Sequence, residues 1–175
     1  MHETSRLARM AIATAALFTA GSAFAEGTVT PEFGIGSGSG KQIGIAGDRQ
    51  TFTYNLGLGY EMENGLGGRI VAIADGDLVR GILAVERSFD NFVGVQATYA
   101  LPLRDKLKVT GGLGIGRTKL DDGNGGGPTS RSITDGILSA GLQYRFAKHY
   151  AMELRVSHLT SSGVTSTALQ AQFPF

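Results

Sequence analysis

The feature of this sequence that most constrains its fold is a two-residue alternation of apolar side chains with polar or small ones. It recurs along the chain after residue 25. In the last such segment, Leu169, Ala171 and Phe173 share one face, and Gln170 and Gln172 share the other. Successive side chains of a β-strand point to opposite faces, so this period indicates strands. No segment after residue 25 has a convincing period of 3.6 residues. The sequence therefore predicts an all-β protein.

The two faces of these segments differ in composition, and the difference separates a membrane barrel from a soluble β-sandwich. One face is apolar and carries aromatic residues near the segment ends, namely Tyr54, Tyr60, Tyr99, Tyr144, Phe146, Phe173 and Phe175. The other is rich in Gly, Ser, Thr and Gln and carries the charged residues Arg69, Arg80, Glu86, Arg145, Glu153 and Arg155. A sandwich buries its apolar faces against each other, whereas a membrane barrel turns its apolar face to lipid. The pattern favours a single antiparallel up-and-down transmembrane β-barrel over the sandwich.

The first 25 residues have a different pattern, which is that of an export signal. Arg6 and Arg9 precede an apolar run over residues 10–20, and Ala23 and Ala25 supply small side chains at the two positions that a signal peptidase reads. We therefore expect residues 1–25 to be a cleaved signal peptide and residues 26–175 to form the barrel.

Several alternating segments also carry a family resemblance. They are residues 99–103, 111–116, 140–146 and 152–156, together with the closing Phe175. They resemble the small outer-membrane barrels of the OmpA/OmpX type, the group described as outer membrane protein β-barrel domains. The resemblance implies an outer-membrane location and a monomer with both ends in the periplasm. It also implies contact with outer-membrane lipid and lipopolysaccharide, recognition of Phe175 by the barrel assembly machinery, and a structural, envelope-integrity or surface-interaction role.

The strand count is the open point of this prediction. Nine segments alternate, at residues 28–37, 51–61, 66–74, 78–88, 91–101, 106–117, 133–146, 149–159 and 166–175. With both ends in the periplasm the count is even, and a spanning strand takes about 9–11 residues. We expect eight strands, with ten as the alternative. The error then lies before residue 90: one candidate there is not a strand, or a tenth strand lies near residues 43–46.

Counting back from Phe175 assigns the connections of the last five candidate strands. Residues 119–131 and 159–165 are expected to be extracellular loops, because they are polar and lie between alternating segments. Residues 102–105 and 147–149 are then expected to be periplasmic turns.

Composition excludes several classes of function. The chain has 175 residues and no Cys, which removes disulfides, Cys-ligated zinc, iron–sulfur clusters and Cys nucleophiles. A net charge of +1 without a basic cluster gives no electrostatic footprint for nucleic acid. The Gly-rich segments 36–41 and 121–127 lack the spacing of a phosphate loop and of a calcium loop. We expect no cofactor and no metal.

The charged residues on the polar face are the main candidates for a functional interior. An eight-stranded barrel leaves a lumen just wide enough for side chains to fill. Buried charges without partners are costly, so we expect the six charged residues named above to pair across a closed lumen. A narrow conducting pore is the alternative.

One segment on the other face suggests a second alternative, an enzyme. Residues 158–163 resemble the His-x-Ser-Asn-x-Gly segment of the lipid A 3-O-deacylases, small outer-membrane barrels that use a Ser/His/Glu arrangement on the lipid-facing wall. His158 has the outward parity, but Thr160 stands where the family has Ser, and no carboxylate follows between residues 159 and 175. We therefore expect no catalytic site, with His158 as an interfacial side chain. A deacylase using His158 and Thr160 remains the alternative.

The signal-peptide assignment predicts where the mature chain begins. Cleavage after Ala25 leaves Glu26 as the first residue of the protein recovered from the outer membrane. N-terminal sequencing of that protein is the measurement. A mature chain that still carries residues 10–20 would contradict the assignment.

Overall fold

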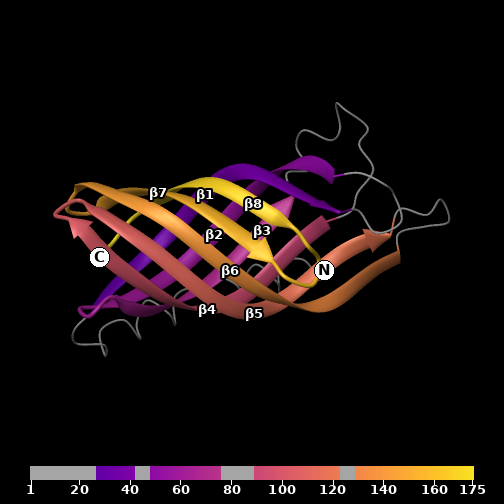
Figure 1. Cartoon of the computed structure of the whole chain (residues 1–175), viewed down its shortest axis with the longest axis horizontal. Coiled ribbons are helices and arrows are strands. Elements are labelled where there is room, and N and C mark those ends of the chain that lie inside the picture. Colours follow the sequence, from indigo (N-terminus) through magenta and orange to yellow (C-terminus); the bar gives the residue numbers. More distant parts are fainter. Residues whose placement is uncertain (1–26, 42–47, 76–88, 123–128) are drawn as a thin grey trace, which may run out of the picture.

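The fold is a closed eight-stranded barrel. The structure is a computed structural model, and it describes residues 27–41, 48–75, 89–122 and 129–175. These residues form the strands β1 (Gly27–Lys41), β2 (Asp48–Met62), β3 (Leu66–Asp75), β4 (Phe89–Arg104), β5 (Leu107–Asp122), β6 (Thr129–Ala147), β7 (Tyr150–Leu159) and β8 (Thr165–Gln172). Each strand pairs with the next, and β8 pairs with β1 (Figure 1). No helix among the described residues is long and apolar enough to cross a membrane.

All eight strand pairs are antiparallel, as an up-and-down barrel requires. The closing pair runs from Glu32 opposite Gln172 to Ser39 opposite Thr165. The chain stays beside β1 after β8 ends, because Phe173 N donates to Pro31 O at 3.1 Å and Phe175 N donates to Val29 O at 2.9 Å. The predicted fold class and the predicted count of eight strands are therefore confirmed.

Eight of the nine candidate segments coincide with the strands of the barrel. The ninth, residues 78–88, lies outside the described residues, as does the possible tenth strand near residues 43–46. Ala74 of β3 pairs with Asn91 of β4, so these two strands are direct neighbours. The eight described strands close the ring by themselves. The one surplus candidate segment, residues 78–88, lies before residue 90, as expected.

Two predicted connections are wrong at their edges. Residues 119–131 were expected to be a loop, yet β5 continues to Asp122 and β6 begins at Thr129, with Lys119 opposite Ser132. Backbone hydrogen bonds between strands do not depend on apolar side chains, so the ladder extends through a polar sequence. Residues 102–105 were expected to be a turn, but β4 runs to Arg104 and only residues 105–106 turn. Its register shifts between Pro102 and Arg104, where proline lacks the N–H donor of a regular ladder.

The other two predicted connections are close to their observed positions. β6 and β7 are joined by a turn at Lys148 and His149, and β7 and β8 by residues 160–164. We call the end that carries the turns at residues 63–65, 105–106 and 148–149 the turn end. The opposite end, with the β7–β8 connection, is the loop end.

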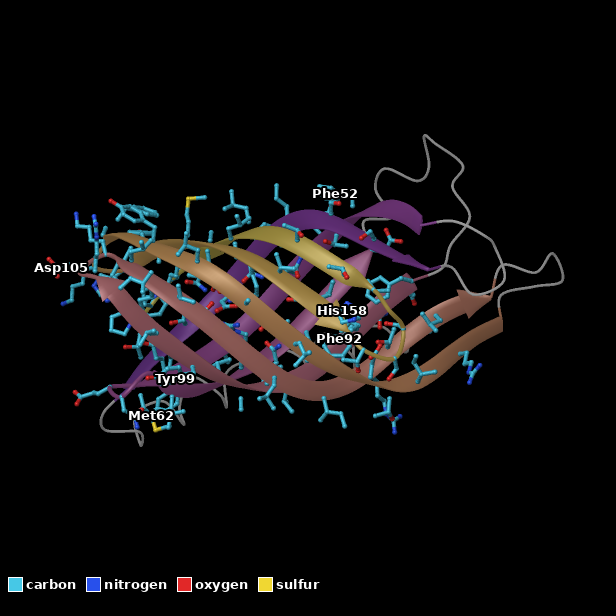
Figure 2. All side chains as sticks on the ribbon, in the orientation of Figure 1. Phe52, Met62, Phe92, Tyr99, Asp105 and His158 are labelled. Atoms are coloured by element: carbon cyan, nitrogen blue, oxygen red, sulfur yellow. The ribbon has the colours of Figure 1, made fainter. Side chains whose placement is uncertain are left out.

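The outer wall of the barrel is apolar. Large hydrophobic side chains project from every strand (Figure 2), and many are about half exposed, such as Leu56 at 54%, Val95 at 55% and Leu113 at 65%. The predicted aromatic residues Tyr99, Tyr144, Phe146, Phe173 and Phe175 are also exposed, and they lie near the turn end. A protein in water does not display an apolar surface this extensive, so this wall is suited to lipid.

The interior differs in part from the predicted ionic and polar lumen. Toward the loop end it contains a buried apolar core made of Val71, Ile73, Phe89, Phe92, Leu120, Ile137, Leu159 and Val164, with Ile133 packed against it. Buried polar side chains lie in both halves, with Glu153 and Arg155 nearer the turn end and Thr53, Thr118 and Asp135 nearer the loop end. Apolar residues occupy both faces of β3, since Val71 and Ile73 point inward while Ile70 points outward. This is why the sequence pattern of β3 was ambiguous.

The apolar core depends on a close approach between Phe92 and two glycines. Phe92 is fully buried, and its ring lies against Gly94 and Gly116, which face each other across β4 and β5. A Cβ atom on Gly116 would lie 2.6 Å from that ring and 2.4 Å from the carbonyl oxygen of Val93. The two glycines therefore form a notch that holds the Phe92 ring, and a larger side chain at either position would collide with that ring.

This notch predicts the effect of adding one methyl group. We expect Gly116→Ala to lower the free energy of unfolding by about 1–3 kcal/mol, because the new methyl group overpacks the interior. Gly111→Ala on the same strand is the control, since nothing lies within 4 Å of the position of its Cβ. Urea unfolding in detergent micelles measures both variants. Equal stability of the two variants would contradict the packing described.

Candidate functional site

Four charged side chains form a balanced cluster inside the barrel. Arg155 of β7 donates from Nη1 to Glu32 Oε2 at 2.8 Å and from Nε to Glu153 Oε1 at 3.0 Å. Arg69 of β3 lies 3.1 Å from Glu32 and 3.8 Å from Glu153, measured from its Nη2 atom to the nearest carboxylate oxygens. We call these four residues the ionic cluster. Its two positive and two negative charges cancel across β1, β3 and β7.

Neutral side chains complete the hydrogen bonding of the ionic cluster. The side-chain nitrogen of Gln172 donates to Glu32 at 3.0 Å and also to Glu153. Gln143 in turn donates to the side-chain oxygen of Gln172, and Thr110 donates to Glu153. Buried charges are tolerated when they are paired and hydrogen-bonded. The arrangement therefore accounts for four ionisable groups in an interior that is nearly closed to solvent.

The structure brings together only part of the predicted set of inward charges. Arg69, Glu153 and Arg155 belong to the ionic cluster, whereas Arg145 is half-buried near the turn end of β6, outside it. Arg80 and Glu86 lie outside the described residues. Glu32 was not among the predicted inward charges, although its alternation with the outward-facing Phe33 and Ile35 was a usable signal.

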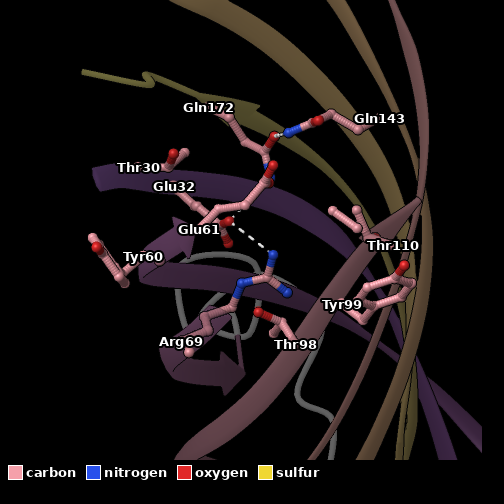
Figure 3. A pocket seen from close by; sticks show the side chains of 13 residues that line it. Thr30, Glu32, Tyr60, Glu61, Arg69, Thr98, Tyr99, Thr110, Gln143 and Gln172 are labelled. Carbon is pink, nitrogen blue, oxygen red and sulfur yellow. Dashed lines mark hydrogen bonds and ion pairs between the residues drawn. The ribbon is translucent and has the colours of Figure 1, made fainter. Parts of the chain in front are cut away.

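A second ion pair lies nearer the turn end. Lys108 of β5 contacts Glu61 of β2, and their side chains are 24% and 32% exposed. Between this pair and the ionic cluster is a cavity of about 30 Å³. Arg69, Thr98 and Gln143 are among the residues that line it (Figure 3).

At the loop end, the buried Asp135 holds the β7–β8 connection in place. Its carboxylate accepts from the backbone N–H of Ser161 at 2.6 Å, from that of Ser162 at 3.1 Å and from Thr118 Oγ1 at 2.9 Å. Val164 of the same connection belongs to the apolar core. The connection is therefore attached to β6 through Asp135 and to the apolar core through Val164.

The outer wall changes character near the loop end, where polar side chains replace the apolar ones. Arg117 and Lys119 on β5 are exposed, and they alternate with the buried Thr118 and Leu120. Their neighbours on the flanking strands form, with them, a patch that we call the outer polar patch, consisting of Asn91, Arg117, Lys119, Ser132 and Thr134.

The contacts of the two basic residues in this patch differ. Lys119 Nζ lies 3.3 Å from Asp90 Oδ2, while Arg117 has no ion-pair partner among the described residues. The outward-facing Val93, Ile115 and Leu138 adjoin the patch on the side of the turn end, and each is more than half exposed. The surface therefore places cationic and hydroxyl groups at the edge of an apolar wall.

His158 and Thr160, the residues of the enzyme alternative, are both exposed near the loop end. His158 Nδ1 lies 3.0 Å from Thr165 Oγ1, its cross-strand neighbour on β8. The hydroxyl of Thr160 donates instead to the carbonyl oxygen of Gly136 at 3.5 Å. The structure thus pairs His158 with Thr165, and it forms no hydrogen bond between the two predicted residues.

No group of three or more His, Asp or Glu side chains in the described part of the chain is arranged to hold a metal ion. The buried carboxylates of Glu32 and Glu153 are already engaged by the guanidinium groups of Arg69 and Arg155. The ionic cluster therefore neutralises charge inside the barrel, and the outer polar patch offers polar contacts at the outer wall.

Comparison with known proteins identifies a family match and several similar structures. The family model described as "Outer membrane protein beta-barrel domain" matches residues 10–173. The structure is similar to Ail, the attachment invasion locus protein of Yersinia pestis, with a TM-score of 0.64, 24% identity, and coverage of 86% of this chain and 99% of that one. None of the curated protein sequences matches this chain.

Two further solved structures show the same fold at lower identity. The N-terminal β-barrel domain of OprF from Pseudomonas aeruginosa has a TM-score of 0.58 at 15% identity, covering 82% of this chain and 97% of that one. Neisserial surface protein A has a TM-score of 0.55 at 16% identity, covering 85% and 95%.

The ionic cluster predicts an unequal response to the loss of two cations. We expect Arg155→Met to lower the free energy of unfolding by about 3–5 kcal/mol, because Glu32 and Glu153 lose a buried partner. Lys119→Met removes an exposed pair and should cost about 0–1 kcal/mol. Urea unfolding in micelles measures both. A small effect of Arg155→Met would show that the ionic cluster does not stabilise the barrel.

Proposed function

Because the chain belongs to the outer membrane protein beta-barrel domain family, we propose that it is a monomeric outer-membrane anchor with a structural or surface-interaction role and a closed lumen. Residues 1–25 direct export and are cleaved. The turn end faces the periplasm, and the loop end faces outward. Phe175, hydrogen-bonded to Val29 at the turn end, is the residue that the barrel assembly machinery reads during insertion.

Two layers inside the barrel support a closed lumen. The ionic cluster occupies the half nearer the turn end, and the apolar core occupies the half nearer the loop end. A hydrated ion would have to separate buried, paired charges in the first layer and then pass the packed side chains of the apolar core in the second. Both steps are costly, so solute passage is disfavoured. The closed ring also leaves no strand edge for pairing with a second copy.

The outer polar patch is the observation that carries the surface-interaction role. We assign it to lipopolysaccharide, whose phosphate groups lie at the level where the apolar wall ends. Arg117 and Lys119 supply cationic donors for a phosphate, and Ser132 and Thr134 supply hydroxyl groups beside them. The adjoining Val93, Ile115 and Leu138 provide an apolar surface for the acyl chains of the same lipid.

This assignment predicts a selective loss of lipopolysaccharide binding. The Arg117→Ala/Lys119→Ala double variant should bind purified lipopolysaccharide about tenfold more weakly, which corresponds to about 1.4 kcal/mol. The readout is binding to the protein in micelles of uncharged detergent. Arg104→Ala/Lys106→Ala is the matched control, because it removes the same charge from exposed positions at the turn end.

Two comparisons complete this test. Lipopolysaccharide stripped of its phosphates should bind the unaltered protein as weakly as the intact lipid binds the double variant. If the double variant keeps the affinity of the unaltered protein, or if the control loses as much, the outer polar patch is not the lipid site.

A further inference from the structure

Positive charge is concentrated on two neighbouring turns of the turn end. Arg104 is the last residue of β4, Lys106 follows in the β4–β5 turn, and Lys148 lies in the β6–β7 turn. All three side chains are exposed. The two turns lie side by side, because the backbone N–H of Arg145 donates to the carbonyl oxygen of Lys106 at 2.8 Å. We call Arg104, Lys106 and Lys148 the turn-end basic patch.

The charge of this patch is not cancelled by the described part of the chain. Asp105 is the one acidic residue of the two turns, and it lies at the end of the barrel (Figure 2). None of the three cations lies within ion-pair distance of a carboxylate among the described residues, whereas the nearby Lys108 contacts Glu61. Glu61 and Glu63 belong to the separate β2–β3 hairpin. The two turns therefore present an excess of positive charge to their surroundings.

Apolar side chains of the outer wall border the turn-end basic patch. Leu101 and Leu103 precede Arg104 on β4 and are 48% and 52% exposed. Phe146 and Tyr150 flank the β6–β7 turn and are 52% and 51% exposed. Long cationic side chains at the edge of such a wall place their charged groups at the level of lipid headgroups. The surface therefore matches an amphiphile that has an anionic headgroup and apolar chains.

We propose that the turn-end basic patch binds an anionic phospholipid of the periplasmic leaflet. This inference rests on the proposed orientation of the barrel, which places the turn end in that leaflet. The lipid phosphate accepts hydrogen bonds from the guanidinium group of Arg104 and from the ammonium groups of Lys106 and Lys148. Its acyl chains lie along the apolar wall beside the patch. A zwitterionic headgroup binds less well, because the cations of the patch repel its ammonium group.

The two ends of the barrel then bind different lipids. In the outer polar patch the cations stand beside the hydroxyl groups of Ser132 and Thr134, which suit a phosphorylated sugar. At the turn end the cations stand beside Leu103, Phe146 and Tyr150, so the headgroup is recognised through its phosphate and its charge. Both lipids carry phosphate, and the experiments below therefore separate the two sites by location.

Binding of phosphatidylglycerol to the protein in micelles of uncharged detergent tests the proposal. The Arg104→Ala/Lys106→Ala variant should bind this lipid about tenfold more weakly. The Arg117→Ala/Lys119→Ala variant is the matched control, because it removes the same charge at the loop end, and it should keep the affinity of the unaltered protein.

Phosphatidylethanolamine, which has no net charge, should bind the unaltered protein as weakly as phosphatidylglycerol binds the Arg104→Ala/Lys106→Ala variant. If that variant keeps its affinity for phosphatidylglycerol, or if the control loses as much, the turn-end basic patch is not the phospholipid site. Lipopolysaccharide binding by the same two variants tests the other end of the barrel, so either lipid site can fail while the other stands.

Nuclear magnetic resonance locates the bound lipid on the unaltered protein. In ¹⁵N-labelled protein in the same micelles, phosphatidylglycerol should shift the backbone amide signals of residues 104–106 and 148–149, which belong to the two turns. The amide signals of Arg117 and Lys119 are the internal control and should stay in place. Shifts confined to the loop end, or shifts of equal size at both ends, overturn the proposal. This comparison needs no substitution, so it stands even if a variant does not fold.

Discussion

The contact of Arg155 with two carboxylates inside the barrel connects β7 to β1, the two strands that flank β8. Arg155 lies between Glu32 and Glu153 and is almost completely buried. Charges are stable there only if their partners are fixed in place, and the partners come from β1 and β7, which lie on either side of β8. A slip of one residue in either strand would turn its charged side chain toward lipid. The ionic cluster therefore fixes the register of the wall where the barrel closes.

The same wall serves two environments because alternate residues face opposite ways. Its lipid side stays apolar up to the outer polar patch, and its inner side carries the ionic cluster nearer the turn end and the apolar core nearer the loop end. The glycine notch beside Phe92 belongs to this division, since it makes room for an aromatic ring in a narrow lumen. An interior of paired charges and packed apolar side chains and a lipid-matched exterior thus follow from one alternating pattern with a local exception.

The sequence predicted the barrel, its eight strands and three members of the ionic cluster, because period-two alternation reports strand faces directly. It did not predict the apolar core, because Val71, Ile73 and Phe92 lie inside while equally apolar neighbours lie outside, and only pairing across the ring distinguishes them. Glu32 was not predicted to point inward, because the many glycines and serines of β1 weaken its alternating pattern. The ends of β5 and β6 were missed because backbone pairing continues through polar residues. The pairing of His158 with Thr165 depends on the β7–β8 register, which composition does not reveal.

We propose that the ionic cluster and the apolar core together seal the barrel. Electrical recording from purified protein in a planar lipid bilayer tests it most directly, once insertion has been verified by the lower gel mobility of boiled samples. A sealed lumen predicts a bilayer whose conductance stays at the level of the protein-free membrane. Discrete, repeated current steps from the unaltered protein would contradict it, because they require a continuous aqueous path past Arg155 and Phe92.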